Sequence, residues 1–485
     1  MSTTKQPTPA NLTAEELLCS SERAWERGSD ALAQALERLS QDALRILYEE
    51  KVTPVRSVVS PEDLDGQLAL PIHSGNLAEV QERVTQLLLS APSTSGRRFF
   101  NQLFAGHDPV GTPVDMLASL VNHSMYTYKV GGPLIVMEEV VLRGLRRLAG
   151  FPEDGGGIFT PGGSLSNLAA MLCARDRVAP EAKEEGTPKG LTLYCSEESH
   201  YSVKKGAGIV GFGRSAVRSV PSDERGVMRT DALTELIQAD RRAGAQPMMI
   251  IATAGTTVLG AFDDLEATAE VADREGLWLH VDGAFGGTAL WSNELKVLCA
   301  GLERADSFTW DAHKAMGLPL TCSALLTRDP HAPARALAEQ ASYLFQTDAD
   351  LLNPGTRSLQ CGRRNDALKL WAAWQYHGDD GWTARTDRLW TLAQALTELI
   401  KRRPQLQLLM EPQYFNVSFE YRGRSSVSIC ERLEQERRAL VGYAYSKGRC
   451  VIRVAVVNPE LTRADLEALL DEVEAVAPHC ELASE

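Results

Sequence analysis

No stretch of this 485-residue chain reaches the eighteen or so consecutive apolar residues that a membrane-spanning helix needs. Residues 1–13 also lack the apolar core of a secretory signal peptide. The nine cysteines are scattered, with no CxxC pair and no zinc-ligand spacing, so neither a disulfide framework nor a metal site is indicated. We therefore expect a soluble, cytoplasmic protein with reduced thiols.

Basic residues are in the minority, since 50 Lys and Arg stand against 64 Asp and Glu. This balance disfavours nucleic acid or an anionic membrane as a partner. Internal repeats and low-complexity tracts are absent as well. What is present, 44% hydrophobic and 24% charged residues, is ordinary for a globular protein with a large core.

The order of the apolar segments predicts three parts. Residues 1–110 form an N-terminal helical part. Its first helix starts with Thr13 and Glu16 in capping-box positions and could pack on this protomer or on a partner. In residues 111–385 short apolar runs alternate with helical ones such as Leu265–Glu275, which is typical of a mainly parallel α/β sheet. Residues 386–485 form a smaller α+β domain. The expected strands are Leu191–Cys195, Met248–Thr253, Leu277–Asp282, Ser307–Trp310, Thr321–Thr327, Tyr414–Tyr421 and Cys450–Val457, with a C-terminal helix over Thr462–Val476.

Two residues at or just after the ends of expected strands indicate a cofactor, because a parallel sheet binds ligands beyond the carboxyl ends of its strands. Lys314 lies beside His313 in a turn between two apolar runs, and a partly desolvated lysine can form an imine with an aldehyde. Asp282 ends an apolar strand and could pair with a protonated pyridine nitrogen. The small residues after it, Gly283–Gly287 apart from Phe285, would let a flat ring approach the backbone. A solvated loop lysine and a strand-end cap are the alternatives, but together the two segments suggest pyridoxal phosphate.

Three further segments suit such a site. Gly155–Asn167 brings glycines and the hydroxyls of Ser164 and Ser166 to a helix start, where amides can bind phosphate or simply form a capped turn. His200 follows a strand and could stack on a planar ring and supply a proton, or cap a helix. Arg453 interrupts an apolar strand, so it meets either an internal carboxylate or the carboxylate of a substrate.

Taken in order, these segments resemble the group II pyridoxal-phosphate-dependent amino-acid decarboxylases, in the branch of the glutamate, cysteine-sulfinate and aspartate decarboxylases. The resemblance runs from about residue 97 to residue 476. The segments that carry it are Arg98–Gly106, Gly157–Asn167, Ser196–Ser202, His280–Gly287, His313–Lys314, Tyr343–Gln346, Leu359–Arg363 and Arg453–Pro459. It implies a fold type I, aspartate aminotransferase-like large domain and a homodimer with sites at the interface. It also implies decarboxylation of a small acidic L-amino acid (aspartate, cysteine sulfinate or glutamate) to the amine and carbon dioxide.

The resemblance also implies roles for single residues. Lys314 would carry the cofactor as an imine, Asp282 would pair with its ring nitrogen, and Gln102 and Arg453 would hold the substrate carboxylate. The other residues that would bind the cofactor are Gly163, Ser164 and His313 at the phosphate, His200 and Ala284 on the two ring faces, Thr256 nearby, and Gly362 against the phosphate of the partner subunit.

The chain departs from the family at three places. Asp311-Ala312 stands where Asn-Pro is usual, which places an acid near the phosphate, and Lys129 stands where an acid is common. Leu351 occupies the position of the tyrosine that protonates Cα, and residues 347–358 contain no tyrosine, so Tyr343 or His200 would have to substitute. These changes motivate two alternatives: a decarboxylating aldehyde synthase or other pyridoxal lyase of specialised metabolism, and a catalytically silent binding partner. The intact set of Lys314, Asp282, His200 and Arg453 argues against the second.

Overall fold

The computed structural model describes residues 14–53, 55, 68, 76–339 and 353–483, with only the backbone given for 14–31. The chain divides into two compact units, Met1–Gly96 and Arg97–Glu485, so the boundary expected near residue 110 lies inside the second unit. Within the described residues, every helix is too short or too polar to span a bilayer.

The first unit is a pair of helices, α1 (Ala14–Val52) and α3 (Leu77–Ser90). The N-terminal helix is therefore confirmed, although Thr13 of the expected capping box lies outside the described residues. Arg45 of α1 pairs with Glu82 of α3 at 3.1 Å and joins the two helices. Large apolar side chains of both helices remain exposed, namely Leu32, Leu36, Leu39, Leu44, Leu47, Val80, Val84, Leu87 and Leu88. These exposed side chains are called the α1/α3 apolar face below.

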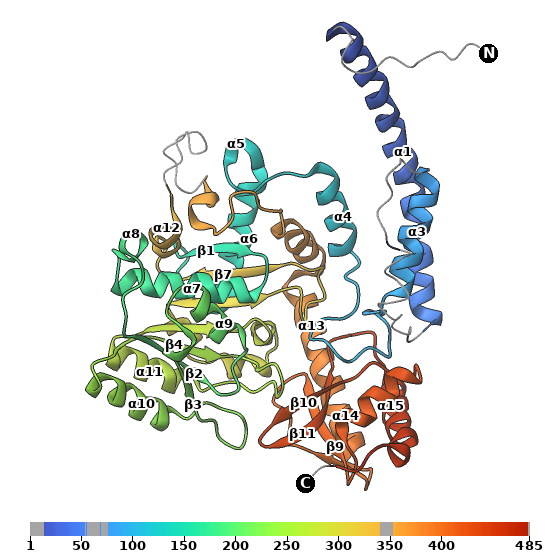
Figure 1. Cartoon of the computed structure of the whole chain (residues 1–485). Helices are drawn as coiled ribbons and strands as arrows, with labels where there is room; N and C mark the ends of the chain where they lie inside the picture. The colour runs from blue at the N-terminus through green and yellow to red at the C-terminus, as the bar shows by residue number, and fades with distance from the viewer. Residues whose placement is uncertain (1–13, 54, 56–67, 69–75, 340–352, 484–485) are drawn as a thin grey trace, which may run out of the picture. The chain divides into compact units, whose positions relative to one another are not determined.

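The second unit is built on a seven-stranded sheet in the order β1-β7-β6-β5-β4-β2-β3 (Figure 1). Its strands are β1 (Gly156–Thr160), β2 (Leu191–Ser196), β3 (Val217–Val220), β4 (Gln246–Thr253), β5 (Trp278–Asp282), β6 (Ser307–Asp311) and β7 (Ser323–Thr327). The five from β6 to β3 run parallel, which confirms a mainly parallel α/β sheet. β7, expected from its apolar run, is antiparallel to both neighbours.

The strand β1 was not predicted, because its first two residues are glycines and were interpreted as part of a loop. The structure explains both glycines by close packing. A Cβ atom on Gly156 would lie 2.4 Å from Oγ1 of Thr327, and one on Gly157 would lie 3.0 Å from the carbonyl oxygen of Leu325. The glycines therefore admit β7 rather than a ligand.

Helices cover both faces of this sheet, as alternation of side chains along each strand requires. The helices of the large domain are α4 (Gly111–Val121), α5 (Tyr128–Gly131), α6 (Pro133–Ala149), α7 (Gly163–Val178), α8 (Ala182–Glu185), α9 (Ser202–Ile209), α10 (Thr230–Arg242), α11 (Leu265–Glu275) and α12 (Ala332–Leu337). In β4, Met249 and Ile251 pack in the cluster that contains α7 and α9, while Ile250 and Ala252 pack with α10 and α11. The prediction for Leu265–Glu275 is confirmed residue for residue.

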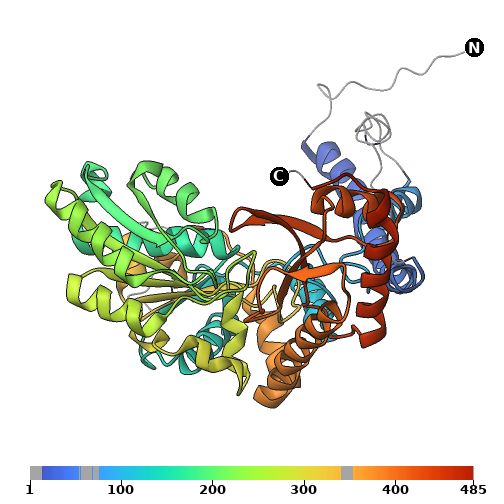
Figure 2. The same cartoon turned by 90° about the horizontal axis from the view of Figure 1, so that it is seen from below.

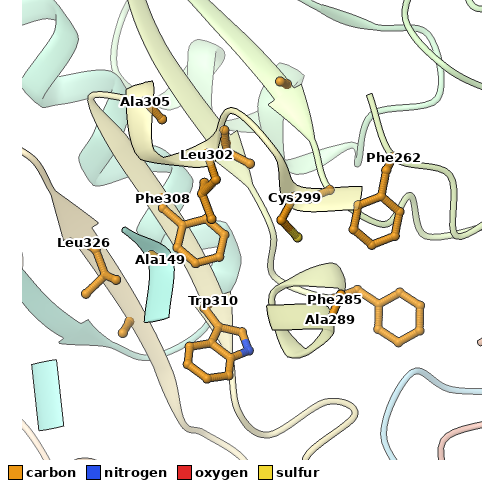
Figure 3. Packing of buried hydrophobic residues seen from close by; sticks show 14 of the residues in the cluster. Ala149, Phe262, Phe285, Ala289, Cys299, Leu302, Ala305, Phe308, Trp310 and Leu326 are labelled. Carbon is orange, nitrogen blue, oxygen red and sulfur yellow. The ribbon is translucent and has the colours of Figure 1, made fainter. Parts of the chain in front are cut away.

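The hydrophobic cluster that contains α10 and α11 explains why small residues follow Asp282. Phe308 and Trp310 of β6 lie side by side in it, next to the turn that carries Ala289 (Figure 3). A Cβ atom on Gly283 would lie 2.2 Å from the Phe308 ring, and one on Gly287 would lie 2.6 Å from the Trp310 ring. Close approach at these two glycines therefore serves the core, and the admission of a cofactor ring by this turn stays a prediction.

The C-terminal part forms a four-stranded antiparallel sheet in the order β10-β11-β9-β8, packed with helices (Figure 2). Its strands are β8 (Leu406–Leu408), β9 (Asn416–Tyr421), β10 (Gly442–Ser446) and β11 (Arg449–Ala455), and its helices are α14 (Ser426–Gln435) and α15 (Arg463–Val476). The expected capping box of α15 is present, with Thr462 and Asp465 bonded reciprocally. The long α13 (Ala367–Lys401), kinked at Gly378, runs through the boundary expected at residue 385.

Candidate active site

A cavity of about 250 Å³ lies at the carboxyl ends of the parallel strands and at the start of α7. Such an edge is where open α/β sheets place their ligands. Seven of the predicted site residues line this cavity together: Gly163, Ser164, His200, Asp282, Ala284, His313 and Lys314. Gly163 and Lys314, which are 151 positions apart in the sequence, thus line one cavity because α7, β2, β5 and β6 end or begin at the same edge.

Lys314 is positioned by the turn that follows β6. Its backbone N–H donates to the carbonyl oxygen of Asp311 at 3.1 Å, and its Nζ lies 3.3 Å from Oδ2 of the same aspartate. His313 Nε2 lies 3.6 Å from that oxygen, and burial lowers the pKa of His313. A neutral His313 leaves Lys314 as the cation that pairs with Asp311.

Asp311 is the acid that replaces the family's asparagine, and the structure shows that it is paired. Its side chain is buried, and its Oδ1 accepts no hydrogen bond from the described residues. A Cβ atom on Gly163 would lie 2.8 Å from Oδ2, so the carboxylate faces the first residue of α7. The carboxylate therefore lies between Lys314 and the N-terminus of α7, and both of these positive groups stabilise its negative charge.

Asp282 is held by a buried hydrogen-bond network. Asn167 Nδ2 donates to its Oδ2 at 2.7 Å, and the backbone N–H of Ala284 donates to its Oδ1 at 3.1 Å. The Oδ1 of Asn167 lies 3.0 Å from Nε2 of His280, whose pKa burial lowers to about 4. A neutral His280 with its proton on Nε2 donates to Asn167, which in turn directs its amide hydrogens at Asp282. The carboxylate thus lines the cavity in a fixed orientation.

His200 lies on the loop between β2 and α9 and is held by Ser202. The backbone N–H of Ser202 donates to Nδ1 at 3.3 Å, and the Ser202 hydroxyl lies 2.8 Å from the same atom. Burial lowers the pKa of His200, although Asp282 opposes this effect. An imidazole that accepts at Nδ1 carries its proton on Nε2, so His200 offers a neutral N–H donor.

Comparison with known proteins gives the site its context. Residues 61–422, more than half of the chain, match the pyridoxal-dependent decarboxylase conserved domain. The chain belongs to the pyridoxal-dependent decarboxylase family. Human cysteine sulfinic acid decarboxylase is 40% identical over 473 residues, which cover 91% of this chain and 96% of the relative. Human acidic amino acid decarboxylase GADL1 is 36% identical, with 91% of each chain covered.

Solved structures agree with this assignment. The crystal structure of mouse CSAD matches with a TM-score of 0.87 at 37% identity, covering 91% of this chain and 98% of that one. The glutamate decarboxylase domain of a Vibrio parahaemolyticus enzyme matches with a TM-score of 0.82 at 26% identity, covering 92% and 96%. The protein is thus a pyridoxal-phosphate-dependent amino-acid decarboxylase of fold type I, a carboxy-lyase.

The residues of the cavity fit pyridoxal phosphate, the cofactor of this decarboxylase family. The backbone N–H groups of Gly163 and Ser164 open α7 and donate to no acceptor among the described residues, so they are available to a phosphate. A side chain at position 163 would collide with Asp311 and with Cβ of Ala284 at 3.0 Å, so only glycine keeps this corner open. Lys314 supplies an amine, and Asp282 supplies the anion that a pyridinium nitrogen requires.

Other predicted residues do not line the cavity of this decarboxylase. Thr256 is buried, and its hydroxyl accepts from the backbone N–H of Ala261, whereas its neighbour Thr257 lines the cavity. Gln102, Lys129 and Gly362 are exposed and lie outside the cavity lining, as seen in one copy of the chain. Tyr343 and Leu351 lie outside the described residues.

Arg453 lies next to the cavity rather than in its lining. Its Nη1 donates to the carbonyl oxygen of Thr257 at 3.1 Å, and its Nη2 donates to the carbonyl oxygen of Asn101. Its Nε is buried without an acceptor, and burial lowers the pKa of its guanidinium. Across residues 76–339 and 353–483 it forms no ion pair, so an internal carboxylate, one of the two alternatives for Arg453, is not found there.

Asn167 and His280 were not predicted individually, although both stood within recognised segments. A helical pattern contains a signal for the first, since Asn167 follows Gly163 by four residues and so lies on the same face of α7. A strand pattern contains a signal for the second, because His280 precedes Asp282 by two residues and points to the same side of β5. Each could have been inferred from the periodicity of its element.

Proposed function

We propose that this enzyme decarboxylates a small acidic L-amino acid (aspartate, cysteine sulfinate or glutamate) and releases the amine and carbon dioxide. The observation that carries the proposal is Arg453, a largely buried guanidinium that lacks a carboxylate partner in the described part of the chain and contacts Thr257 at the cavity. A buried cation of this kind is stabilised when a ligand supplies the anion. The names of the most similar relatives, cysteine sulfinic acid decarboxylase and acidic amino acid decarboxylase, support the same substrate class.

Each residue of the cavity has a role in this proposal. Gly163 and Ser164 would bind the cofactor phosphate through backbone N–H groups, and Lys314 would bind the cofactor covalently. Asp282 would keep the ring nitrogen protonated, and His200 and Ala284 would hold the ring. Bound pyridoxal phosphate supplies the acceptor for the electron pair that remains when the Cα–carboxylate bond breaks.

The protein contributes orientation and proton control. Arg453 receives the acidic side-chain group of the substrate, a carboxylate or a sulfinate, through its bidentate fork, which leaves the α-carboxylate to be expelled. His200 lines the cavity with its proton on Nε2, and in this proposal it delivers that proton to Cα after carbon dioxide leaves. This assignment gives His200 the role of the tyrosine that residues 347–358 lack.

A substrate panel with Arg453 variants tests the proposal. The wild-type enzyme should convert at least one of the three acidic amino acids to its amine with equimolar carbon dioxide. Arg453→Met should lower kcat/KM for that substrate by at least about 30-fold, because truncating one partner of a buried charge pair costs about 2–5 kcal/mol. Arg453→Lys should restore only part of the loss, since an ammonium group lacks the bidentate fork.

The matched control is Arg449→Lys, a change on the same strand at an arginine paired with Glu420 at the surface. It should leave kcat/KM unchanged. If Arg453→Met decarboxylates the acidic substrates as well as wild type does, the assigned substrate contact is wrong. Aldehyde and peroxide in place of amine would instead favour the aldehyde synthase.

We also propose that the enzyme is a homodimer, with the α1/α3 apolar face covered by a second copy. Leu44 and Val84 on that face are more than half exposed, although exposed apolar area of this kind is costly in water. In such a dimer, Gly362 would approach the cofactor phosphate of the partner subunit.

Sedimentation velocity tests the dimer. The wild type should sediment as a species of twice the 53.0-kDa chain mass, and Leu44→Glu with Val84→Glu should shift it toward the single chain. Val297→Glu, a change of equal polarity at an exposed residue outside this face, is the control. A wild type that stays at the mass of one chain contradicts the proposal.

A further inference from the structure

A second and larger cleft, of about 690 Å³, lies at the far end of the β1–β7 pair from the active site. Thr160 at the carboxyl end of β1 leads directly into the active-site cavity through Pro161. Gly156, at the other end of β1, pairs with Thr327 of β7, and it is beyond this end that the second cleft opens. The charged residues of its lining include Glu139, Arg143, Arg146, Glu153, Asp154 and Arg357.

Two of its arginines are more than nine-tenths buried and incompletely bonded. Arg146 uses Nη2, which donates to Glu139 Oε1 at 2.7 Å and to the carbonyl oxygen of Glu153 at 2.9 Å. Its Nε and Nη1 are buried and have no acceptor. Arg357 is only 8% exposed, its Nε has no acceptor, and its guanidinium forms no hydrogen bond or ion pair within residues 76–339 and 353–483.

The acids around Arg357 are already engaged by other arginines. Glu138 is bound by both Nη atoms of Arg363, at 2.7 and 2.8 Å, and Glu139 is bound by Arg146. The interior cluster thus contains three guanidinium groups and two carboxylates. One buried positive charge is left over, and a bare buried charge is costly unless an anion meets it.

The rim of the cleft adds one more cation and limits the size of a ligand. Arg143 is exposed and makes no ion pair among the described residues, while Glu153 and Asp154 are exposed acids that repel a large polyanion. A planar guanidinium fork matches a carboxylate or a phosphate in bidentate geometry. The site therefore suits one small anion of this geometry.

We propose that this cleft binds a small oxyanion, of the phosphate or carboxylate class, through the free donors of Arg357 and Arg146. The site is separate from the catalytic cavity, so it does not depend on the identity of the amino-acid substrate. It would give the enzyme a second point at which an anionic metabolite binds and stabilises the folded chain.

The test uses the holoenzyme, in which the catalytic phosphate site is filled by cofactor. In phosphate-free buffer at constant ionic strength, inorganic phosphate or succinate should raise Tm by about 3 °C near saturation, because a ligand that binds only the folded state stabilises it. Titration calorimetry with inorganic phosphate should give one site per chain. A shift with phosphate alone or with succinate alone identifies which of the two anion classes the site takes.

Arg357→Met is the decisive variant. It removes the unpaired buried charge, so its Tm without added anion should equal or exceed that of wild type, and the anion-induced shift should disappear. Arg364→Gln removes the same charge from an exposed arginine paired with Asp115, outside the cleft, and should keep the full shift. The proposal is overturned if neither anion shifts wild-type Tm, or if Arg357→Met responds as wild type does.

Discussion

Replacing Lys314 with alanine should lower kcat by at least about a thousandfold, because loss of a covalent catalytic group removes most of the rate acceleration at such sites. The structure places this amine in the cavity, 3.3 Å from Oδ2 of Asp311 and beside the open start of α7. The visible absorption band of lysine-bound pyridoxal phosphate should vanish from the purified variant. In wild-type protein reduced with borohydride, mass spectrometry should find the cofactor mass on the peptide that contains Lys314.

Two variants separate this chemistry from the ion pair. Lys314→Arg keeps a cation beside Asp311 but cannot form an imine, so it should be as inactive as Lys314→Ala while folding normally. Lys205→Ala, at an exposed lysine of α9, should change neither the band nor the rate. A cofactor mass on another peptide, or a persistent band in Lys314→Ala, would show that the lysine is wrongly assigned.

The elements that carry this site were predictable where the hydrophobic pattern was strong. β5 and β6 are continuous buried strands. α11 is capped at its start by Asp264, whose side chain accepts from the backbone N–H of Ala267, and at its end by Gly276. β1 was not predicted because its glycines are required for packing against β7. The local sequence contains no pattern that indicates this packing. The antiparallel direction of β7 is likewise a property of the sheet and not of its own residues.

Within the site, the sequence predicted chemistry better than it predicted contacts. Lys314 and Asp282 could be placed because a strand end directs each of them at the ligand edge. Thr256 and Thr257 are adjacent, and only the turn after β4 decides which of them faces the cavity. The partners of Arg453 are two backbone carbonyl oxygens, and side-chain patterns contain no information about such partners.

Asp282→Asn should lower kcat by about 10²–10³-fold while the cofactor stays bound, because loss of one preorganised electrostatic contact at a reacting centre has effects of that size. The carboxylate is 6% exposed and is the anion that would hold the ring nitrogen protonated. An amide at this position carries no charge. Lys314 and the start of α7 remain in place, so the absorption band of the lysine-bound cofactor should persist as activity falls.

The network behind Asp282 makes the substitution more severe than a simple loss of charge. Asn167 Nδ2 donates to Asp282 Oδ2, and its orientation is fixed because its own Oδ1 accepts from Nε2 of His280. A new amide at position 282 must therefore present its oxygen to Asn167, which leaves its NH₂ near Ala284 N and the ring. That group is a donor and cannot pair with a protonated pyridine nitrogen.

A second buried carboxylate provides the matched control for Asp282→Asn. Asp263 accepts from the backbone N–H groups of Met228 and Thr253, both at 2.7 Å, and lies outside the cavity lining. Asp263→Asn should lower Tm, because an amide oxygen replaces only one of the two acceptors, yet it should preserve kcat of the folded fraction. Asp282→Asn should show the reverse pattern, with a large fall in kcat and little change in Tm. If both variants lose stability and activity in proportion, Asp282 acts on the fold alone and its assigned role at the ring nitrogen is wrong.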